Sequence, residues 1–178
     1  MSMMETIKLF LPLVNNKNLG NIFDIVLSKY NGTTDDFLKD TCHDLLRVML
    51  CYQDQVRIKA MYEMCVSALT NKDHKKQKKA YKMLEEICAS DIGSSCHEFL
   101  KSHLSQIQEQ MLASLSKASP PSQVSRLRCL TNIIKNLDDD QEEFVYKVIP
   151  EAILCVKAVN EKARSGSFTL LVVIGEVR

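Results

Sequence analysis

The sequence lacks tryptophan, contains few glycines and prolines, and has no long apolar segment. Its 5 glycines and 4 prolines are too few for the many tight turns of an all-β chain of 178 residues. The longest apolar candidate, 168–174, falls far short of the ~20 residues that span a bilayer. Glu5 and Lys8 interrupt the apolar N-terminal stretch. We therefore expect neither a membrane span nor a secretory signal peptide.

Closely spaced cysteine pairs are also missing. None of the 7 cysteines belongs to a CxxC motif, and their number is odd. Both features argue against a disulfide framework and against a structural zinc site. Several cysteines fall where a helix would turn them toward a core, and a free thiol behaves there as a small apolar residue. We therefore expect free core cysteines and a reducing compartment, which is the cytosol or the nucleus.

Catalytic and cofactor-binding motifs are absent as well. Two histidines directly follow a cysteine, in Cys42-His43 and Cys96-His97, and adjacent residues on a helix do not share a face. Neither an HExxH motif nor a glycine-rich phosphate loop occurs. The acidic run at 138–140 lacks the ligand spacing of a calcium loop and is expected at a helix start. The sequence predicts a non-catalytic protein without cofactor, metal site or small-molecule substrate.

Helical periodicity runs through almost the whole sequence. Hydrophobic residues make up 46% and charged residues 25%, which is ordinary for a globular domain. Turn residues interrupt the pattern at 31–32, 90–93 and 119–122. Short polar residues stand at the expected helix starts, namely Asn18, Thr34, Asp54, Asp73, Ser95, Asp140 and Asn160. The predicted helices of this all-α chain are 3–14, 18–30, 34–51, 54–70, 73–89, 95–116, 124–137, 140–157 and 160–175.

An internal repeat separates the two architectures that such helices can form, a bundle and a solenoid. The first helices of HEAT repeats often carry a small residue, a basic residue, a small residue three positions on and an apolar residue four further. This pattern starts at Ala163, less well at Ser125, and without its basic residue at Lys76. The intervals of 49 and 38 residues bracket the HEAT period of roughly 40–47. A match at Val56, only 20 residues before Lys76, is interpreted as coincidence.

The repeat predicts a HEAT/armadillo-type superhelical solenoid of antiparallel helix pairs, with 1–178 as a single repeat segment. Its last predicted helix, 160–175, has an apolar face that includes Phe168 and Leu171, and no partner helix follows it. A free-standing array would cover such a face with a polar capping helix. We therefore expect the chain to belong to a longer array, as a fragment or a truncated isoform.

A local excess of lysine departs from the nearly balanced charge of the chain, which is +1 overall. Residues 71–90 contain 6 basic and 3 acidic side chains. Five of the lysines fall on one face of the predicted helix: Lys72, Lys75, Lys76, Lys79 and Lys82. The opposite face is an apolar stripe: Ala80, Leu84, Ile87 and Cys88. Such a lysine face can neutralise RNA phosphates or bind an acidic partner, and the alternative is an ordinary solvated surface.

Two arginines extend the candidate binding surface. They are Arg126 and Arg128, although a spacing of two residues points them in different directions. Residues 75–79 also resemble a short nuclear-import signal, but they lie within a predicted helix, whereas import receptors read extended peptides. Tyr81 is expected to face inward, which leaves no aromatic residue among the lysines for base stacking. Any RNA contact is therefore expected at the backbone and sensitive to salt.

Four blocks of sequence resemble one family. They are 77–88, 102–115, 126–130, and 148–155 with 160–164. Together these blocks resemble the ribosomal RNA processing protein twelve-like family of eukaryotic HEAT-repeat proteins, most strongly over 73–175. The resemblance implies a nuclear and nucleolar factor that accompanies pre-ribosomal particles in rRNA processing and in the export of ribosomal subunits.

The same resemblance implies a scaffold that binds RNA, nuclear-transport components and assembly proteins without catalysis. The runner-up interpretation is a HEAT-repeat adaptor between proteins in nuclear transport, without direct RNA binding. The two interpretations differ in one respect that can be measured. RNA binding that depends on the lysines favours the first of them.

Overall fold

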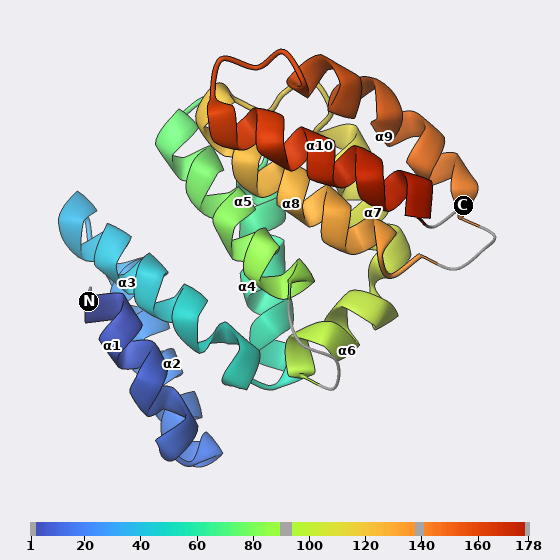
Figure 1. Ribbon diagram of the computed structural model, residues 1–178. Coiled ribbons are helices and arrows are strands. Elements are labelled where there is room, and N and C mark those ends of the chain that lie inside the picture. The colour runs from blue at the N-terminus through green and yellow to red at the C-terminus, as the bar shows by residue number, and fades with distance from the viewer. Residues whose placement is uncertain (1–2, 90–93, 138–140, 177–178) are drawn as a thin grey trace.

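The computed structural model describes residues 3–89, 94–137 and 141–176. Within these ranges the chain forms α-helices joined by short turns (Figure 1). Their bounds are Met3–Phe10 (α1), Asn16–Gly32 (α2), Asp36–Met49 (α3), Gln55–Ala68 (α4), His74–Cys88 (α5), Ser95–Ser102 (α6), Leu104–Ala113 (α7), Gln123–Ile134 (α8), Glu142–Cys155 (α9) and Glu161–Glu176 (α10). Short 3₁₀ turns follow α1 and α3 and precede α8.

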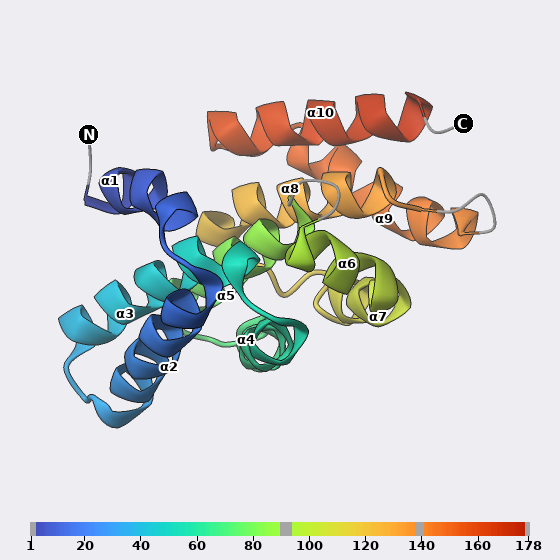
Figure 2. The same ribbon diagram turned by 90° about the horizontal axis from the view of Figure 1, so that it is seen from below.

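The helices alternate between two layers, as Figure 2 shows from below. The first layer contains α3, α5, α8 and α10, in which α5 packs along α8 and α8 along α10. The second layer contains α2, α4, α6, α7 and α9, and α2 packs on α3, α4 on α5 and α9 on α10. Helix α1 contacts α3. This alternation confirms the predicted solenoid of antiparallel helix pairs.

Short polar side chains cap most helix starts, because they accept hydrogen bonds from backbone N–H groups that lack a partner within the helix. The capping residues are Asn15, Asp35, Asp54, Asp73, Ser94 and Asn160. Asp54, Asp73 and Asn160 were predicted as helix starts. The predicted Thr34 lies one residue before the actual cap of α3, and Asp140 lies outside the described residues.

The predicted helix 95–116 is wrong, since the structure divides it into α6 and α7 at His103. The backbone of His103 leaves the helical region, with φ of −120° and ψ of 16°. Its ring stacks on Phe99 with the ring centroids 4.1 Å apart, and the Ser102 hydroxyl donates to the Glu98 carbonyl at 2.7 Å. These local side-chain contacts hold the break, and neither glycine nor proline marks it in the sequence.

Apolar residues from both layers fill one continuous core, which includes Phe23, Leu46, Tyr62, Phe99 and Leu130. Six of the cysteines are buried and Cys51 is half-buried, and all seven are free thiols. Burial raises the pKa of the Cys65 thiol, which keeps it protonated and apolar in character. The cysteines therefore serve as core residues, as the sequence predicted.

The second residue of the repeat pattern, which is polar or basic in all three matches, has a structural role in the first layer. Gln77 Nε2 on α5 donates to the Leu69 carbonyl at 2.8 Å, and Arg126 Nη2 on α8 donates to the Met111 carbonyl at 2.8 Å. Arg164 Nη1 on α10 donates to the Ala158 carbonyl at 2.9 Å. Gln77 and Arg126 thus satisfy carbonyl groups at the ends of α4 and α7, and Arg164 satisfies those of the turn between α9 and α10.

The pattern match at Val56 is a coincidence, as the sequence suggested. Its basic residue, Arg57, lies on α4 in the second layer. The guanidinium pairs with Asp24 of α2, with Nη2 and Oδ2 2.6 Å apart, and with Asp54 of its own helix. Arg57 therefore joins two helices of the second layer and does not hold the end of a preceding helix.

Candidate nucleic-acid interface

Helix α5 carries the predicted lysine face and its opposing apolar stripe. Ala80, Leu84, Ile87 and Cys88 are all buried, and Tyr81 is fully buried, as the sequence predicted. The N-terminus of α5 is fixed by Asp73, whose Oδ1 accepts hydrogen bonds from the backbone N–H groups of the first turn. The lysines therefore project from the opposite, exposed side of a well-anchored helix.

The structure divides the lysine face between two environments. Lys75 and Lys79 turn toward Asp40 on α3, with their Nζ atoms 2.6 and 2.9 Å from its carboxylate oxygens. Burial opposes the charge of Asp40, but these hydrogen bonds to both lysines hold its pKa below the usual range. Lys76 pairs loosely with Asp73, with Nζ and Oδ2 3.9 Å apart. These three lysines are therefore partly neutralised within the chain.

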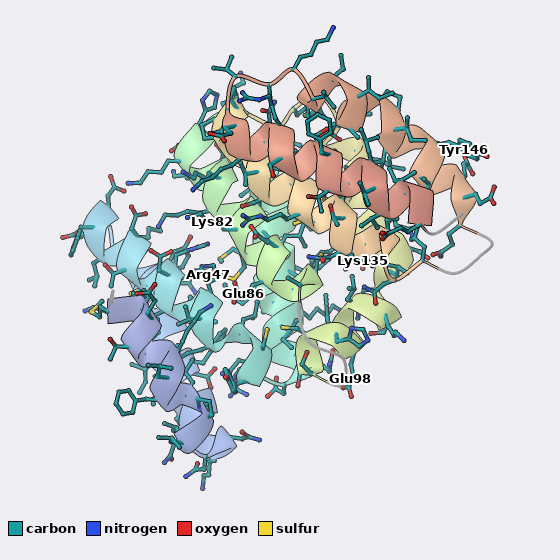
Figure 3. All side chains as sticks on the ribbon, in the orientation of Figure 1. Arg47, Lys82, Glu86, Glu98, Lys135 and Tyr146 are labelled. Carbon is teal, nitrogen blue, oxygen red and sulfur yellow. The ribbon has the colours of Figure 1, made fainter. Side chains whose placement is uncertain are left out.

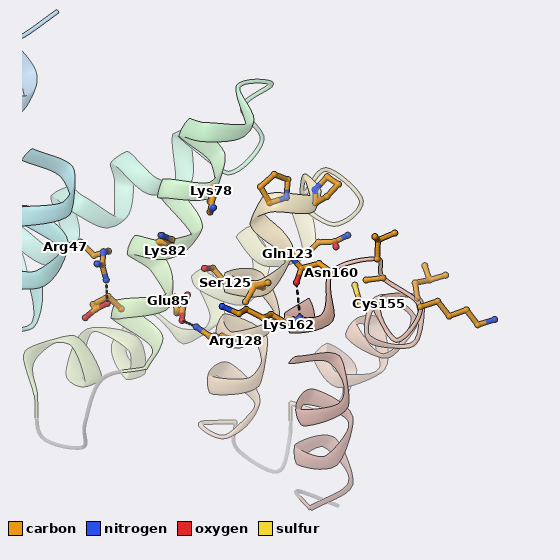
Figure 4. A pocket seen from close by; sticks show the side chains of 18 residues that line it. Arg47, Lys78, Lys82, Glu85, Gln123, Ser125, Arg128, Cys155, Asn160 and Lys162 are labelled. Carbon is orange, nitrogen blue, oxygen red and sulfur yellow. Dashed lines mark hydrogen bonds and ion pairs between the residues drawn. The ribbon is translucent and has the colours of Figure 1, made fainter. Parts of the chain in front are cut away.

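Lys82 belongs to a second environment, a groove over the exposed face of the first layer. The groove runs from α3 across α5 and α8 to the turn between α9 and α10 (Figure 4). Its lining contains six basic side chains: Arg47, Lys78, Lys82, Arg128, Lys157 and Lys162. It contains two acidic side chains, Glu85 and Glu86. We call this surface the basic groove.

Both carboxylates of the basic groove are already paired. Glu85 Oε1 lies 2.9 Å from Arg128 Nη1. Glu86 accepts from Arg47 at 2.9 Å and from Lys8 of α1 at 3.2 Å. Figure 3 shows Arg47, Lys82 and Glu86 close together between α3 and α5. The arginines are thereby compensated, and the net positive charge of the groove comes from its lysines.

Four lysines carry this excess charge: Lys78, Lys82, Lys157 and Lys162. All four are exposed, and no carboxylate in the described part of the chain forms an ion pair with them. They come from α5, from the α9–α10 turn and from the start of α10. A concave surface lined by charges of one sign focuses its potential and attracts a polyanion.

Arg126 does not belong to this surface, which corrects the prediction. Its guanidinium is 1% exposed and pairs with Glu151 of α9, with Nη2 2.9 Å from Oε2. Nη1 also donates to the Tyr81 hydroxyl at 3.0 Å and to the Ser114 hydroxyl at 2.8 Å. Burial opposes its charge, but Glu151 raises the pKa of the guanidinium above its usual value. Arg126 is therefore a structural residue.

The two remaining predicted residues have different outcomes, since Arg128 lies in the basic groove and Lys72 does not share the predicted helix face. Arg128 is exposed at the floor of the basic groove, so the two arginines do point in different directions. Lys72 is exposed just before α5 and lines neither the groove nor the surface around Asp40. Of the seven predicted residues, the groove thus brings together Lys82 and Arg128.

Sequence reasoning missed Lys78 of α5, which the predicted lysine face did not include, and a further three basic residues that come from distant parts of the chain, namely Arg47, Lys157 and Lys162. One signal was available for Lys162. It directly precedes the repeat pattern at Ala163, as Lys75 precedes the pattern at Lys76. The repeat register therefore gives both lysines equivalent positions in the first layer, but only Lys162 lines the basic groove, because Lys75 turns toward Asp40.

The chemistry of the basic groove suits phosphate contacts. Its lining contains no aromatic side chain on which a base could stack. In the described ranges, no three His, Cys, Asp or Glu side chains gather in a way that could hold a metal ion. No described helix is both long and apolar enough to cross a membrane. The groove presents ammonium groups at the ends of flexible lysine side chains, which can pair with phosphates.

Sequence comparison defines the class of the protein. The model of the family described as "Stalled ribosome sensor GCN1-like, HEAT repeats" matches residues 15–172. The chain therefore belongs to this family of HEAT-repeat proteins. The all-α solenoid of paired helices agrees with that membership.

Individual relatives carry a more specific name. The chain is 34% identical to human RRP12-like protein over 98% of its own length and 39% identical to the chicken RRP12-like protein over 80%. It is 24% identical to Ribosomal RNA-processing protein 12 of Saccharomyces cerevisiae over 97% of its length. The resemblance predicted from the sequence is confirmed. The chain spans 13%, 11% and 15% of these relatives, respectively.

Proposed function

We propose that this chain is a non-catalytic scaffold segment in ribosome biogenesis, and that its basic groove binds the phosphate backbone of structured RNA. One observation carries the proposal. Four exposed lysines without a carboxylate partner in the described ranges converge on one groove from separate elements of the first layer. The relatives' names, which refer to ribosomal RNA processing, supply the RNA class.

We propose the wider role with support from the same relatives, whose names are RRP12-like protein and Ribosomal RNA-processing protein 12. In this proposal the segment 1–178 is part of a longer HEAT array in the nucleus and nucleolus. The array accompanies pre-ribosomal particles through rRNA processing and nuclear export of the subunits. It contacts RNA together with nuclear-transport and assembly proteins.

The second candidate is a protein-to-protein adaptor in nuclear transport without direct RNA binding. It is favoured by the lysines around Asp40, because a protein partner can replace an intramolecular ion pair with one of its own. The two candidates differ in the ligand of the basic groove. A direct binding measurement therefore separates them.

Charge reversal in the groove tests the proposal. We expect Lys78→Glu with Lys82→Glu to weaken binding to a structured RNA hairpin by about 30-fold or more near 0.15 M salt, because two phosphate contacts are lost. Fluorescence anisotropy with a labelled hairpin measures the change. Both side chains are exposed, so the fold should tolerate the substitutions.

A matched variant controls for net charge. Lys17→Glu with Lys59→Glu changes the charge by the same amount on α2 and α4, in the second layer, where both lysines are exposed. We expect it to bind the hairpin within about threefold of the wild type, since long-range charge is largely screened at this salt. Equal losses in both variants, or no RNA binding by the wild type, would favour the adaptor.

A further inference from the structure

The wall of the basic groove formed by the end of α9 and the α9–α10 turn carries exposed apolar side chains. Leu154 is 76% exposed and Val159 is 100% exposed, and both line the groove. Pro120, Pro121 and Val124 continue this apolar surface at the start of α8. Phosphate binding does not require such an apolar surface, because phosphates are contacted by cations and hydrogen-bond donors. We call Leu154 and Val159, with Lys157 between them, the apolar shelf.

The backbone of the apolar shelf is held in place. The Asn160 side chain accepts from the backbone N–H groups of Lys162 at 2.9 Å and Ala163 at 3.2 Å. Arg164 Nη1 donates to the carbonyl groups of Ala158 at 2.9 Å and of Val159 at 2.8 Å. A preorganised turn loses little conformational entropy when a ligand binds to it. The exposure of its apolar residues is therefore a fixed feature of the described structure.

Charge indicates which kind of partner suits the apolar shelf. Lys157 lies between the two apolar residues, and Lys162 follows on the first turn of α10. No carboxylate in the described ranges pairs with either lysine, while both acidic residues of the groove are paired with arginines. An apolar side chain flanked by acidic residues complements this pattern. A basic or neutral apolar segment does not.

We infer that the apolar shelf docks a segment of a partner protein in which an apolar side chain is flanked by aspartate or glutamate. The apolar side chain covers Leu154 and Val159, and the flanking carboxylates pair with Lys157 and Lys162. This site goes beyond the proposed RNA contact, because it uses Leu154 and Val159, which phosphates do not need, while it shares Lys157 and Lys162 with the RNA surface. A protein contact and an RNA contact therefore overlap at these two lysines of one groove.

A defined peptide tests this inference on the full chain. The probe is a fluorescein-labelled peptide in which two leucines stand among aspartates and glutamates. We expect it to bind wild-type protein, and to lose about tenfold or more in affinity when its leucines are replaced by serine, the change expected for one buried apolar side chain. Replacing its acidic residues with lysine should abolish binding.

Variants of the chain assign the binding to the shelf. We expect Leu154→Ser with Val159→Ser to lower the affinity for the acidic peptide by about tenfold or more and to leave the affinity for RNA unchanged. Val56→Ser is the matched control, since Val56 is 78% exposed but lies on α4, away from the groove. Thermal melting should be the same for all three proteins, because the changed side chains are exposed.

Three outcomes would overturn the inference. The first is no binding of the acidic peptide to the wild type, and the second is equal binding by the shelf variant. The third is a loss of RNA binding in the shelf variant, which would assign the shelf to the RNA site. Because the RNA assay with the lysine variants is independent, the inference can fail while the proposed function holds.

Discussion

We expect Arg126→Ala to lower the free energy of unfolding by about 3–5 kcal/mol, the range for breaking a buried ion pair from one side. Glu151 is left as a charge that is 13% exposed and has lost its cation. The Met111 carbonyl, the Tyr81 hydroxyl and the Ser114 hydroxyl each lose a hydrogen bond as well. Urea unfolding followed by circular dichroism measures the change. Since domains are stable by only about 5–15 kcal/mol, this loss is a large fraction of the total.

The neighbouring arginine provides the control. Arg128 also pairs with a glutamate, but its side chain is 58% exposed, so Arg128→Ala should cost about 0–1 kcal/mol. Arg126→Met combined with Glu151→Leu should recover part of the loss, because no buried charge remains unpaired. If the two arginine variants destabilise the chain equally, Arg126 does not have the structural role assigned to it.

We expect His43 to make the chain less stable as the pH falls below about 6.5. The pKa of His43 is lowered from 6.5 to about 4, chiefly by burial and further by the positive charge of Lys79, whereas Asp44 opposes the shift. The ring is 5% exposed, and its Nδ1 lies 3.8 Å from Asp44 Oδ1, beyond hydrogen-bonding distance. The folded chain therefore keeps this imidazole neutral over a range in which the unfolded chain protonates it.

The sign and size of the effect follow from linkage. Between pH 6.5 and 4 the unfolded state binds a proton at His43 that the folded state does not bind. The free energy of unfolding is therefore unaffected by His43 above this window, and it decreases as the pH falls through the window. At pH 5 the loss is about 2 kcal/mol relative to neutral pH. Urea unfolding at the two pH values should show this difference for the wild type beyond that of His43→Leu. Parallel losses in both proteins would contradict a neutral, buried His43.

The helical repeat was predictable because its signals are local. Apolar periodicity indicated the helical segments, although it merged α6 and α7 into one helix. The repeat pattern at Lys76, Ser125 and Ala163 identified α5, α8 and α10, which do lie in one layer. The break at His103 was missed, because it depends on ring stacking and hydroxyl contacts that leave no turn signature. Periodicity alone cannot detect a break made by ordinary helix-compatible residues.

The candidate site was less predictable, because its charges are balanced by residues far away in the sequence. The lysine face of α5 is continuous in the sequence, but Asp40 of α3 neutralises Lys75 and Lys79. Arg126 carries the same charge as Arg128, yet the register of α8 turns it into the core. Helix geometry predicts the direction in which each charged side chain points. Only the tertiary structure shows which carboxylates pair with it.

The salt dependence of RNA binding tests the central claim most directly. If four lysines of the basic groove contact phosphates, the logarithm of the association constant should fall with the logarithm of the salt concentration with a slope of about −3 to −4. Lys78→Glu with Lys82→Glu should bring this slope to about −2, because each lost phosphate contact removes about one unit. A slope near zero, or the same slope in wild type and variant, would contradict phosphate binding in the basic groove.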